Sequence, residues 1–200
     1  YKSFLDNSKT EREFAANAIQ AAEELGYVDI SAKDTLKPGD KVYQSIKGKG
    51  FAAAIIGKKS PAEGFNILGA HIDSPRLDLK PNPIYEDNDT VYFKTHYYGG
   101  IKKYQWLAMP LAINGFVFLK DGSCVDVNIG DSPEDPVFCI SDILPHIAQS
   151  QMAKTASDFV EGEKLDLIIG CGPVEGDEKE PNKKAVNYCS FTANSLTCPL

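Results

Sequence analysis

The chain has 200 residues, which is enough for one large domain or two small ones. Its formal net charge is −7 at pH 7, whereas a general nucleic-acid binder needs a basic surface that neutralises phosphates, so the composition excludes that class of protein. No apolar run approaches the roughly 18 residues that a membrane span requires, and no membrane partner is expected.

The five cysteines indicate the redox compartment. Their number is odd and no two have C-x-x-C spacing, whereas a disulfide framework usually uses an even set. Reduced thiols are therefore expected, which favours a cytoplasmic location. The irregular spacing of Cys171, Cys189 and Cys198 argues against a structural zinc site.

The first predicted element is a helix over residues 10–25. Thr10 and Glu13 have the T-x-x-E spacing of a capping box, in which each side chain binds the backbone N–H of the other residue. Gly26 follows at the position where helices commonly end. An apolar stripe along this helix would face the core, and it consists of Phe14, Ala15, Ala18, Ile19, Ala22 and Leu25.

Three strands are predicted in the next part of the chain. Residues 41–46 alternate loosely between apolar and polar, and a glycine turn follows over residues 47–50. Residues 51–56 and 66–70 are short apolar runs, which are typical of strands covered on both faces in a layered α/β sheet. The last of these strands would end at His71.

The pattern changes after Pro75, where short strands and turns become frequent. Pro81 and Pro83 are expected to break the chain, and we place a domain boundary near residue 79. Residues 87–89 and the pair Asp121-Gly122 each predict a hairpin turn. The strands predicted for this β-rich region cover residues 84–86, 91–98, 116–119, 124–129, 137–140 and 165–169, with one helix within 143–157.

The string Gly69-Ala70-His71-Ile72-Asp73-Ser74-Pro75 has the most chemical content. Ligand sites in open α/β sheets gather beyond the carboxyl ends of strands, where His71 would stand. His71 could present one ring nitrogen to a metal while Asp73 holds the proton on the other. From the residues alone H-x-D stays ambiguous, because a histidine at a strand end is more often a hydrogen-bonded structural residue.

Longer blocks narrow the interpretation. They are Tyr1-Lys2-Ser3-Phe4-Leu5-Asp6, Lys9-Thr10-Glu11-Arg12-Glu13, the string around His71 continued through Arg76-Leu77, Lys94-Thr95-His96-Tyr97-Tyr98-Gly99-Gly100-Ile101-Lys102-Lys103-Tyr104-Gln105-Trp106 and Leu144-Pro145-His146-Ile147-Ala148. In this order they resemble the aspartyl aminopeptidase / aminopeptidase I family of zinc metallo-exopeptidases, over the chain from its first residue to about residue 180.

The resemblance implies a fold, an activity and a metal. The fold class would be α/β, with residues 1–79 forming the N-terminal part of a zinc-exopeptidase sheet domain and residues 80–200 an inserted β-rich dimerisation domain. The activity would be release of N-terminal residues, acidic ones in some members, from a peptide substrate. His71 would be a zinc ligand, Asp73 would be the catalytic-site residue that orients it, and a complete enzyme would hold two zinc ions. Relatives assemble into large homo-oligomers.

The chain departs from the family pattern in two respects. The remaining metal ligands and the catalytic glutamate of relatives lie beyond the insertion, and one histidine cannot form a zinc site, which needs at least three protein ligands. The adjacent Glu23 and Glu24 favour a solvated pair on the predicted helix. Because residues from about Val186 onward also leave the family pattern, we expect a truncated chain that is inactive alone. The alternative is a non-catalytic self-association or regulatory module derived from such an enzyme.

Two further histidines have open interpretations. His146 either packs or caps near a helix start, or reaches the active site of a neighbouring subunit, as the inserted domain can do in relatives. His96 lies in a predicted strand, which favours a cross-strand hydrogen bond.

Charged and aromatic residues of the β-rich region add weaker signals. Lys102 and Lys103 could bind an acidic substrate or shape a subunit contact, and Trp106 fits an interface or a core equally well. Glu86, Asp87 and Asp89 lack the spacing of an EF-hand, so a solvated turn is favoured there.

Overall fold

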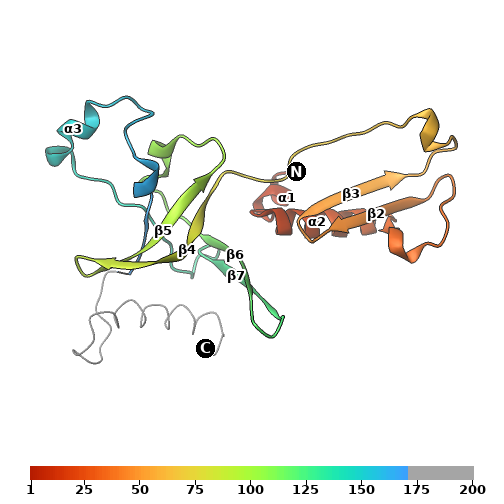
Figure 1. Ribbon diagram of the computed structural model, residues 1–200, viewed down its shortest axis with the longest axis horizontal. Helices are drawn as coiled ribbons and strands as arrows, with labels where there is room; N and C mark the ends of the chain where they lie inside the picture. Colours follow the sequence, from red (N-terminus) through yellow and green to blue (C-terminus); the bar gives the residue numbers. More distant parts are fainter. Residues whose placement is uncertain (171–200) are drawn as a thin grey trace. The chain divides into compact units, whose positions relative to one another are not determined.

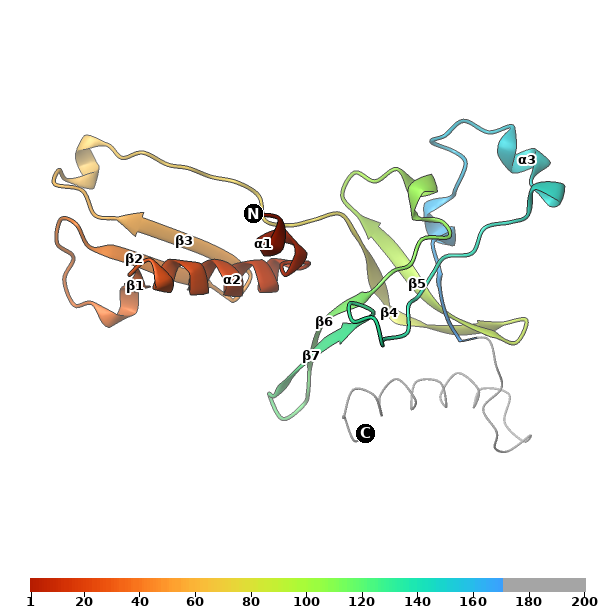
Figure 2. The ribbon, with the colours of Figure 1, turned by 180° about the vertical axis from the view of Figure 1, so that it is seen from behind.

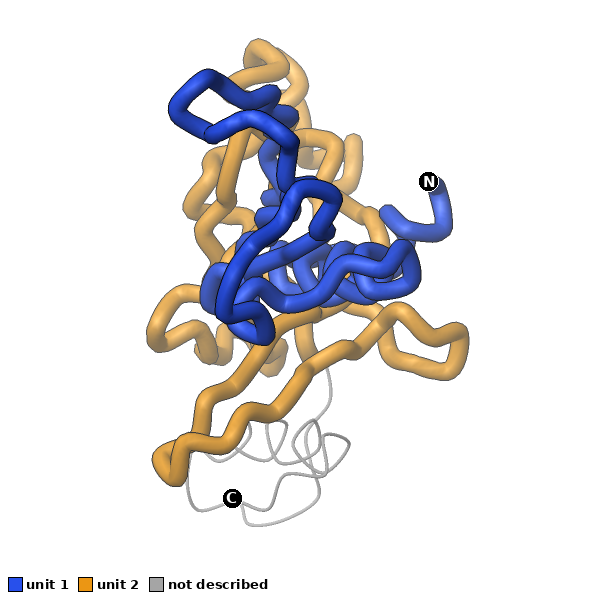
Figure 3. Tube along the Cα trace, turned by 90° about the vertical axis from the view of Figure 1, so that its right-hand side faces the viewer, with its two compact units in different colours: residues 1–74 blue, residues 75–200 orange. Residues whose placement is uncertain are grey.

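The computed structural model describes residues 1–170, and the chain divides into two compact units (Figure 1). Unit 1 comprises residues 1–74, and unit 2 begins at Pro75 (Figure 3). Each unit contains sheets of its own, so the described part of the chain is mixed α/β. The assignment of residues 80–200 to a dimerisation domain stays a prediction.

Unit 1 begins with two helices, α1 (Lys2–Asp6) and α2 (Glu11–Glu24). The predicted capping box is present at the start of α2. The Thr10 N–H donates to Glu13 Oε2 at 2.8 Å, and the Glu13 N–H donates to Thr10 Oγ1 at 3.3 Å. These bonds satisfy two backbone donors that an uncapped helix would leave unpaired, which fixes where α2 begins.

Helix α2 also ends where the sequence predicts, just before Gly26. Gly26 has a φ of 82°, a left-handed conformation that glycine adopts at little cost. Its N–H donates to the Glu23 carbonyl at 2.9 Å, and the next N–H, that of Tyr27, donates to the Ala22 carbonyl at 3.0 Å. This pair of bonds is the Schellman arrangement that ends a helix. The predicted helix is confirmed.

One three-stranded sheet completes unit 1. Its order is β1 (Val28–Asp29), β2 (Lys41–Ile46) and β3 (Gly50–Ile55), with β1 parallel and β3 antiparallel to β2. Helix α2 packs against β2 and β3 (Figure 2). Val42 and Tyr43 are buried in this layer.

Strand β3 is not covered on both faces, contrary to the prediction. Its last four residues, Ala52 to Ile55, are all exposed, and Ile55 retains 61% of its surface. Within residues 1–74 helix α2 is the layer that contacts this sheet, so the apolar composition of β3 is not matched by burial.

The strand predicted at residues 66–70 is absent. The chain between η2 (Pro61–Glu63) and β4 (Arg76–Asp87) forms no regular element and runs as a plain tube in Figure 1. Its apolar side chains face solvent, with exposed fractions of 72% for Phe65, 74% for Ile67 and 101% for Leu68. A strand covered on both faces needs hydrogen-bonded neighbours and a layer above and below it, and unit 1 provides neither for this segment.

Unit 2 opens with the hairpin predicted around residues 87–89. Strand β4 pairs with β5 (Thr90–Tyr98) in antiparallel fashion. Asn88 and Asp89 form the turn with φ values of 49° and 58°, the left-handed pair that a two-residue type I′ turn requires. This prediction is confirmed.

The prolines of unit 2 do not break the chain, contrary to the prediction. Pro81 and Pro83 lie inside β4, where its pairing with β5 is interrupted between Leu79 and Ile84. A proline has no N–H to donate to the ladder, so a strand tolerates it at such an irregularity.

The rest of unit 2 builds a core beside this hairpin. Strand β8 (Leu167–Gly170) pairs with β5 to give the order β4-β5-β8. Strands β6 (Ile113–Phe118) and β7 (Cys124–Ile129) form the second predicted hairpin. The strand predicted at residues 137–140 is reduced to isolated bridges. The buried core consists of Phe138, Ile140, Val160, Leu165 and Leu167.

Helical structure in unit 2 is short. The helix expected within residues 143–157 is limited to η4 (Pro145–Ile147) and α3 (Gln149–Met152). The remaining short 3₁₀ turns of the two units are η1 (Ile30–Ala32), η3 (Lys103–Trp106) and η5 (Gly162–Lys164). Among residues 1–170, none of the helices has the length and apolar character that crossing a membrane would require.

Candidate metal centre

His71 and Asp73 are hydrogen-bonded to each other in the irregular segment before β4. The Nδ1 atom of His71 lies 3.1 Å from Asp73 Oδ1 and 3.1 Å from the Asp73 carbonyl oxygen. In the tautomer with Nδ1 protonated, the imidazole donates to these oxygens. A carboxylate holds a metal-binding histidine by this same contact, which keeps the proton away from the other ring nitrogen.

The imidazole is open to solvent. The His71 side chain is 85% exposed and the Asp73 side chain 36% exposed. Within residues 1–170, Nε2 of His71 has no hydrogen-bond partner. A neutral imidazole nitrogen of this kind is a common metal ligand. The prediction that this residue stands at the end of a strand is wrong, because residues 66–70 form none.

The described residues do not complete a metal site. Residues 1–170 contain no group of three or more His, Cys, Asp or Glu side chains placed to hold a metal ion. A catalytic zinc usually has about three protein ligands and one open position. The His71–Asp73 pair alone supplies fewer protein ligands than such a site needs.

The other two histidines lie in unit 2. His96 stacks on Tyr97 with ring centroids 5.6 Å apart, and its side chain makes no hydrogen bond within the described residues, so the predicted cross-strand bond is not formed. His146 is exposed on η4 and is not packed.

The other residues that the sequence analysis names as candidates lie outside the candidate metal centre. Asp87 and Asp89 are exposed in the β4–β5 turn, as a solvated turn predicts. Glu86 is partly buried and its Oε2 atom has no hydrogen-bond partner among the described residues, so the prediction is wrong for this residue. Trp106 packs against the core of unit 2. Cys124 and Cys139 are free thiols. The three other cysteines, from Cys171 onward, and the altered pattern near the end lie outside the described residues.

A partly buried polar network in unit 2 has no signal in the sequence. The Tyr85 hydroxyl donates to Asp166 Oδ2 at 2.7 Å, and the Thr95 N–H donates to Asp166 Oδ1 at 3.3 Å. The hydroxyl of Thr95, which is 1% exposed, donates to the Leu165 carbonyl. Burial first, and then the bond to Asp166, raises the pKa of the Tyr85 phenol. Tyr85 and Asp166 are 81 residues apart, so no local motif signals the pair.

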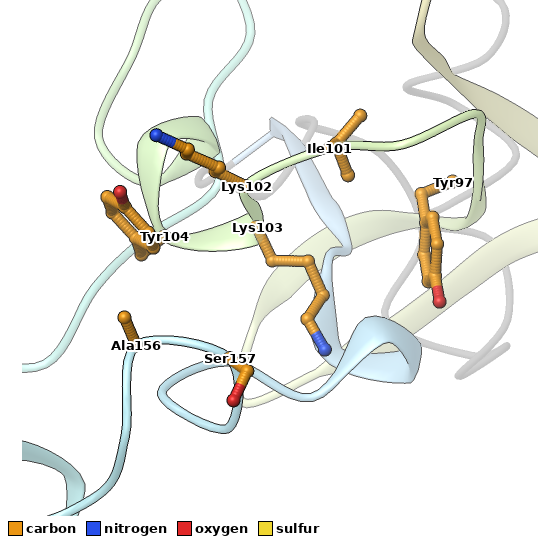
Figure 4. A pocket seen from close by; sticks show the side chains of 7 residues that line it. All are labelled: Tyr97, Ile101, Lys102, Lys103, Tyr104, Ala156 and Ser157. Carbon is orange, nitrogen blue, oxygen red and sulfur yellow. The ribbon is translucent and has the colours of Figure 1, made fainter.

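A pocket of about 460 Å³ was also missed, although two of its residues had been singled out (Figure 4). Its walls come from the end of β5, from the segment that leads into η3, and from the loop before η5. The lining residues are Tyr97, Ile101, Lys102, Lys103, Tyr104, Ala156 and Ser157. The pocket is formed within unit 2.

Comparison with known proteins places this arrangement in a family. A family model described as aminopeptidase I zinc metalloprotease (M18) matches residues 4–198. A probable M18 family aminopeptidase 1 of Clostridium acetobutylicum is 54% identical over 188 residues, which cover 92% of this chain and 40% of that protein. A related protein of Borreliella burgdorferi, also described as a probable M18 family aminopeptidase 1, is 50% identical over 186 residues.

Solved structures agree with the sequence matches. The crystal structure of an M18 family aminopeptidase from Thermotoga maritima matches with a TM-score of 0.86 and 40% identity, over 96% of this chain and 42% of that one. The aminopeptidase I of Clostridium acetobutylicum matches with a TM-score of 0.81 and 48% identity, over 100% and 44% of the two chains. The chain thus spans about two fifths of the length of these relatives. It belongs to the aminopeptidase I (M18) family of zinc metalloproteases.

Proposed function

We propose that this chain forms part of a zinc-dependent aminopeptidase that removes N-terminal residues, acidic ones among them, from peptides. The observation that carries the proposal is the 3.1 Å contact between His71 Nδ1 and the Asp73 carboxylate, in a member of a zinc metalloprotease family. The free thiols of Cys124 and Cys139 suit a cytoplasmic enzyme.

His71 would bind zinc through Nε2. Asp73 holds the proton at Nδ1, which leaves the Nε2 lone pair available and raises the basicity of the ring. The exposed imidazole requires no rearrangement of a packed interior to meet a metal. The other ligands and the catalytic glutamate would come from the part of the relatives' length that this chain does not span.

Zinc, two ions in our proposal, would polarise the scissile carbonyl and lower the pKa of a bound water. The residues of this chain would contribute to that chemistry by holding the metal in position. His71 fixes one coordination direction, and Asp73 prevents the ring from flipping or changing tautomer. We therefore propose that the 200-residue chain has no peptidase activity alone, because the ligands other than His71 would come from the part of the relatives' length that it does not span.

A chimaera tests the proposal. Residues 1–170 of this chain are joined to the remaining C-terminal part of the Clostridium acetobutylicum relative, and release of N-terminal Asp, Glu and Ala from peptides is measured with and without a chelator. We expect hydrolysis that the chelator abolishes and zinc restores. The His71→Ala chimaera should lose both its activity and its bound zinc. The Asp73→Asn chimaera should show a zinc affinity or a hydrolysis rate that is about 10- to 100-fold lower.

His96→Ala is the matched control, because it removes an exposed histidine of the same chain that lies outside the proposed site. It should keep full activity. Hydrolysis that persists in the chelator, or a His71→Ala chimaera with unchanged zinc content and rate, would overturn the proposal.

A second proposal concerns assembly. We propose that copies of the chain self-associate through unit 2, which exposes Ile143, Leu144, Ile147 and Met152 within a stretch of ten residues, with exposed fractions of 47%, 67%, 70% and 68%. Contiguous exposed apolar side chains often mark an interface. Light scattering should detect oligomers that Leu144→Ser with Ile147→Ser disperses, whereas a strict monomer at high concentration would end the idea. If chimaeras lack activity and oligomers persist, the non-catalytic module is the better interpretation.

A further inference from the structure

We propose that the pocket between η3 and the loop before η5 binds a small organic anion, specifically a carboxylate carried on an aromatic or apolar body. All residues that line the pocket belong to unit 2, and neither His71 nor Asp73 is among them. The proposal therefore does not depend on peptidase activity.

The charge in this pocket points to an anion. Lys103 is half-buried in its wall, and neither Lys103 nor Lys102 has an ion-pair partner within residues 1–170. Among the described residues, four lysines do form ion pairs: Lys33 with Asp40, Lys80 with Glu163, and both Lys154 and Lys164 with Glu161. The unpaired ammonium group of Lys103 enters the pocket, and the lining contains no acidic side chain, so the charge favours a negatively charged occupant.

The shape and the other walls point to an aromatic or apolar body. In Figure 4 the Lys103 side chain extends toward the side of the pocket that holds Tyr97 and Ser157, while Lys102 extends the other way. Tyr97, Tyr104 and Ile101 supply rings and an aliphatic surface, and Ser157 supplies a hydroxyl. A volume of about 460 Å³ falls within the range of small-molecule sites. A carboxylate can thus reach Lys103 while its body lies against the tyrosine rings.

The Tyr97 wall is held firmly in place. Its ring stacks on His96, with centroids 5.6 Å apart. On another side it lies so close to Gly162 that a Cβ at that position would stand 2.5 Å from Tyr97 Cε1. Only glycine allows this approach, so the backbone of η5 sets the position of one pocket wall.

Calorimetric titration of the purified 200-residue chain tests the proposal with two matched probes. N-acetylphenylalanine carries the carboxylate and the ring, and N-acetylphenylalanine amide carries the ring alone. We expect the acid to bind at one site and the amide at least tenfold more weakly, which is the loss expected for one hydrogen bond to a charged group. Inorganic phosphate, the third probe, should bind more weakly than the acid because it lacks the apolar body.

Variants locate the site. Lys103→Met should weaken binding of the acid about tenfold or more, and Lys103→Arg should retain most of it. Lys120→Met removes the same charge from the exposed turn between β6 and β7 and should leave binding unchanged. Gly162→Ala alters no charge but displaces the Tyr97 ring, so it should weaken the acid and leave the circular dichroism of the chain intact.

Several outcomes would overturn the proposal. These are equal affinities for acid and amide, no binding of the acid at millimolar concentration, phosphate binding tighter than the acid, and an acid affinity that Lys103→Met does not change. If Lys103→Met instead reduces self-association in light scattering and the acid does not bind, the pocket receives a side chain of a second copy.

Discussion

The two units bury their apolar side chains to different extents. Unit 2 has a contiguous core in which Leu165 is 0% and Ile140 2% exposed. In unit 1 the buried apolar residues are Ala15, Ala22, Val42 and Tyr43, and two of these four are alanines. Unit 1, which carries His71, thus buries less apolar surface than unit 2. The candidate metal ligand and the larger hydrophobic core therefore belong to different parts of the chain.

The largest expected effect concerns these cores. Leu165→Ala removes a fully buried side chain and should destabilise unit 2 by about 2–5 kcal/mol, because a cavity is left behind. Val42→Ala in unit 1 should cost about 2 kcal/mol, since it removes two methyl groups. Hydrogen exchange of backbone amides, measured in increasing urea, gives the loss of unfolding free energy separately for each unit. Equal losses at both positions would contradict the difference between the cores.

The next effect concerns the tyrosine–carboxylate pair of unit 2. Tyr85→Phe removes the 2.7 Å bond to Asp166 and should cost about 1.5 kcal/mol, the low end for a bond to a charged group, because the ring is partly exposed. Denaturant unfolding of unit 2 measures the loss. Tyr92→Phe keeps the neighbouring stacked ring, so it controls for the removal of a hydroxyl. A Tyr85→Phe chain as stable as the original would show that the bond contributes nothing.

Unit 1 has a tyrosine–carboxylate pair of its own, and its contribution to stability should depend on pH. The Tyr43 hydroxyl donates to Glu23 Oε1 at 2.6 Å, and this bond raises the pKa of Tyr43 to about 12. Because the folded pKa lies above the ordinary value of 10.0, the stabilisation is complete below pH 10 and is lost as pH rises through about 12. Tyrosinate absorbance of the wild type and of Tyr43→Phe isolates this titration. Ionisation of Tyr43 near 10 would contradict the bond.

The smallest effect is expected at the surface of unit 1. The hydrogen bond from Lys33, followed by that from the Lys37 N–H, holds the pKa of Asp40 below its ordinary value of 3.8. A lowered folded pKa means that the stabilisation is present above pH 3.8 and is lost as pH falls below it. The stability of Asp40→Asn should therefore converge with that of the wild type in acid. A difference that stays constant with pH would exclude this origin.

Local patterns predicted local structure well. Thr10 with Glu13 and Gly26 located both ends of α2, because a cap is formed by residues within a few positions of each other. The turn at residues 88–89 was predicted for the same reason. His71 and Asp73 were singled out because they stand two positions apart, and their contact follows from that spacing.

Features that depend on distant partners were not predicted. Residues 66–70 have the composition of a buried strand, but burial requires neighbours that composition does not specify. The bond between Tyr85 and Asp166 joins residues far apart in sequence, and the pocket joins Lys103 to Ser157. The break predicted at Pro81 and Pro83 does not form, because the sequence does not reveal where the pairing of two strands is irregular.

Those two prolines have a consequence for solubility. Within the described residues β4 is the outermost strand of the order β4-β5-β8, and its free side could template a strand from another molecule. The irregular backbone around Pro81 and Pro83 interrupts the straight row of donors and acceptors that another strand needs in order to pair along this edge. This stretch of β4 thereby disfavours amyloid-like addition of a strand at that edge of the sheet.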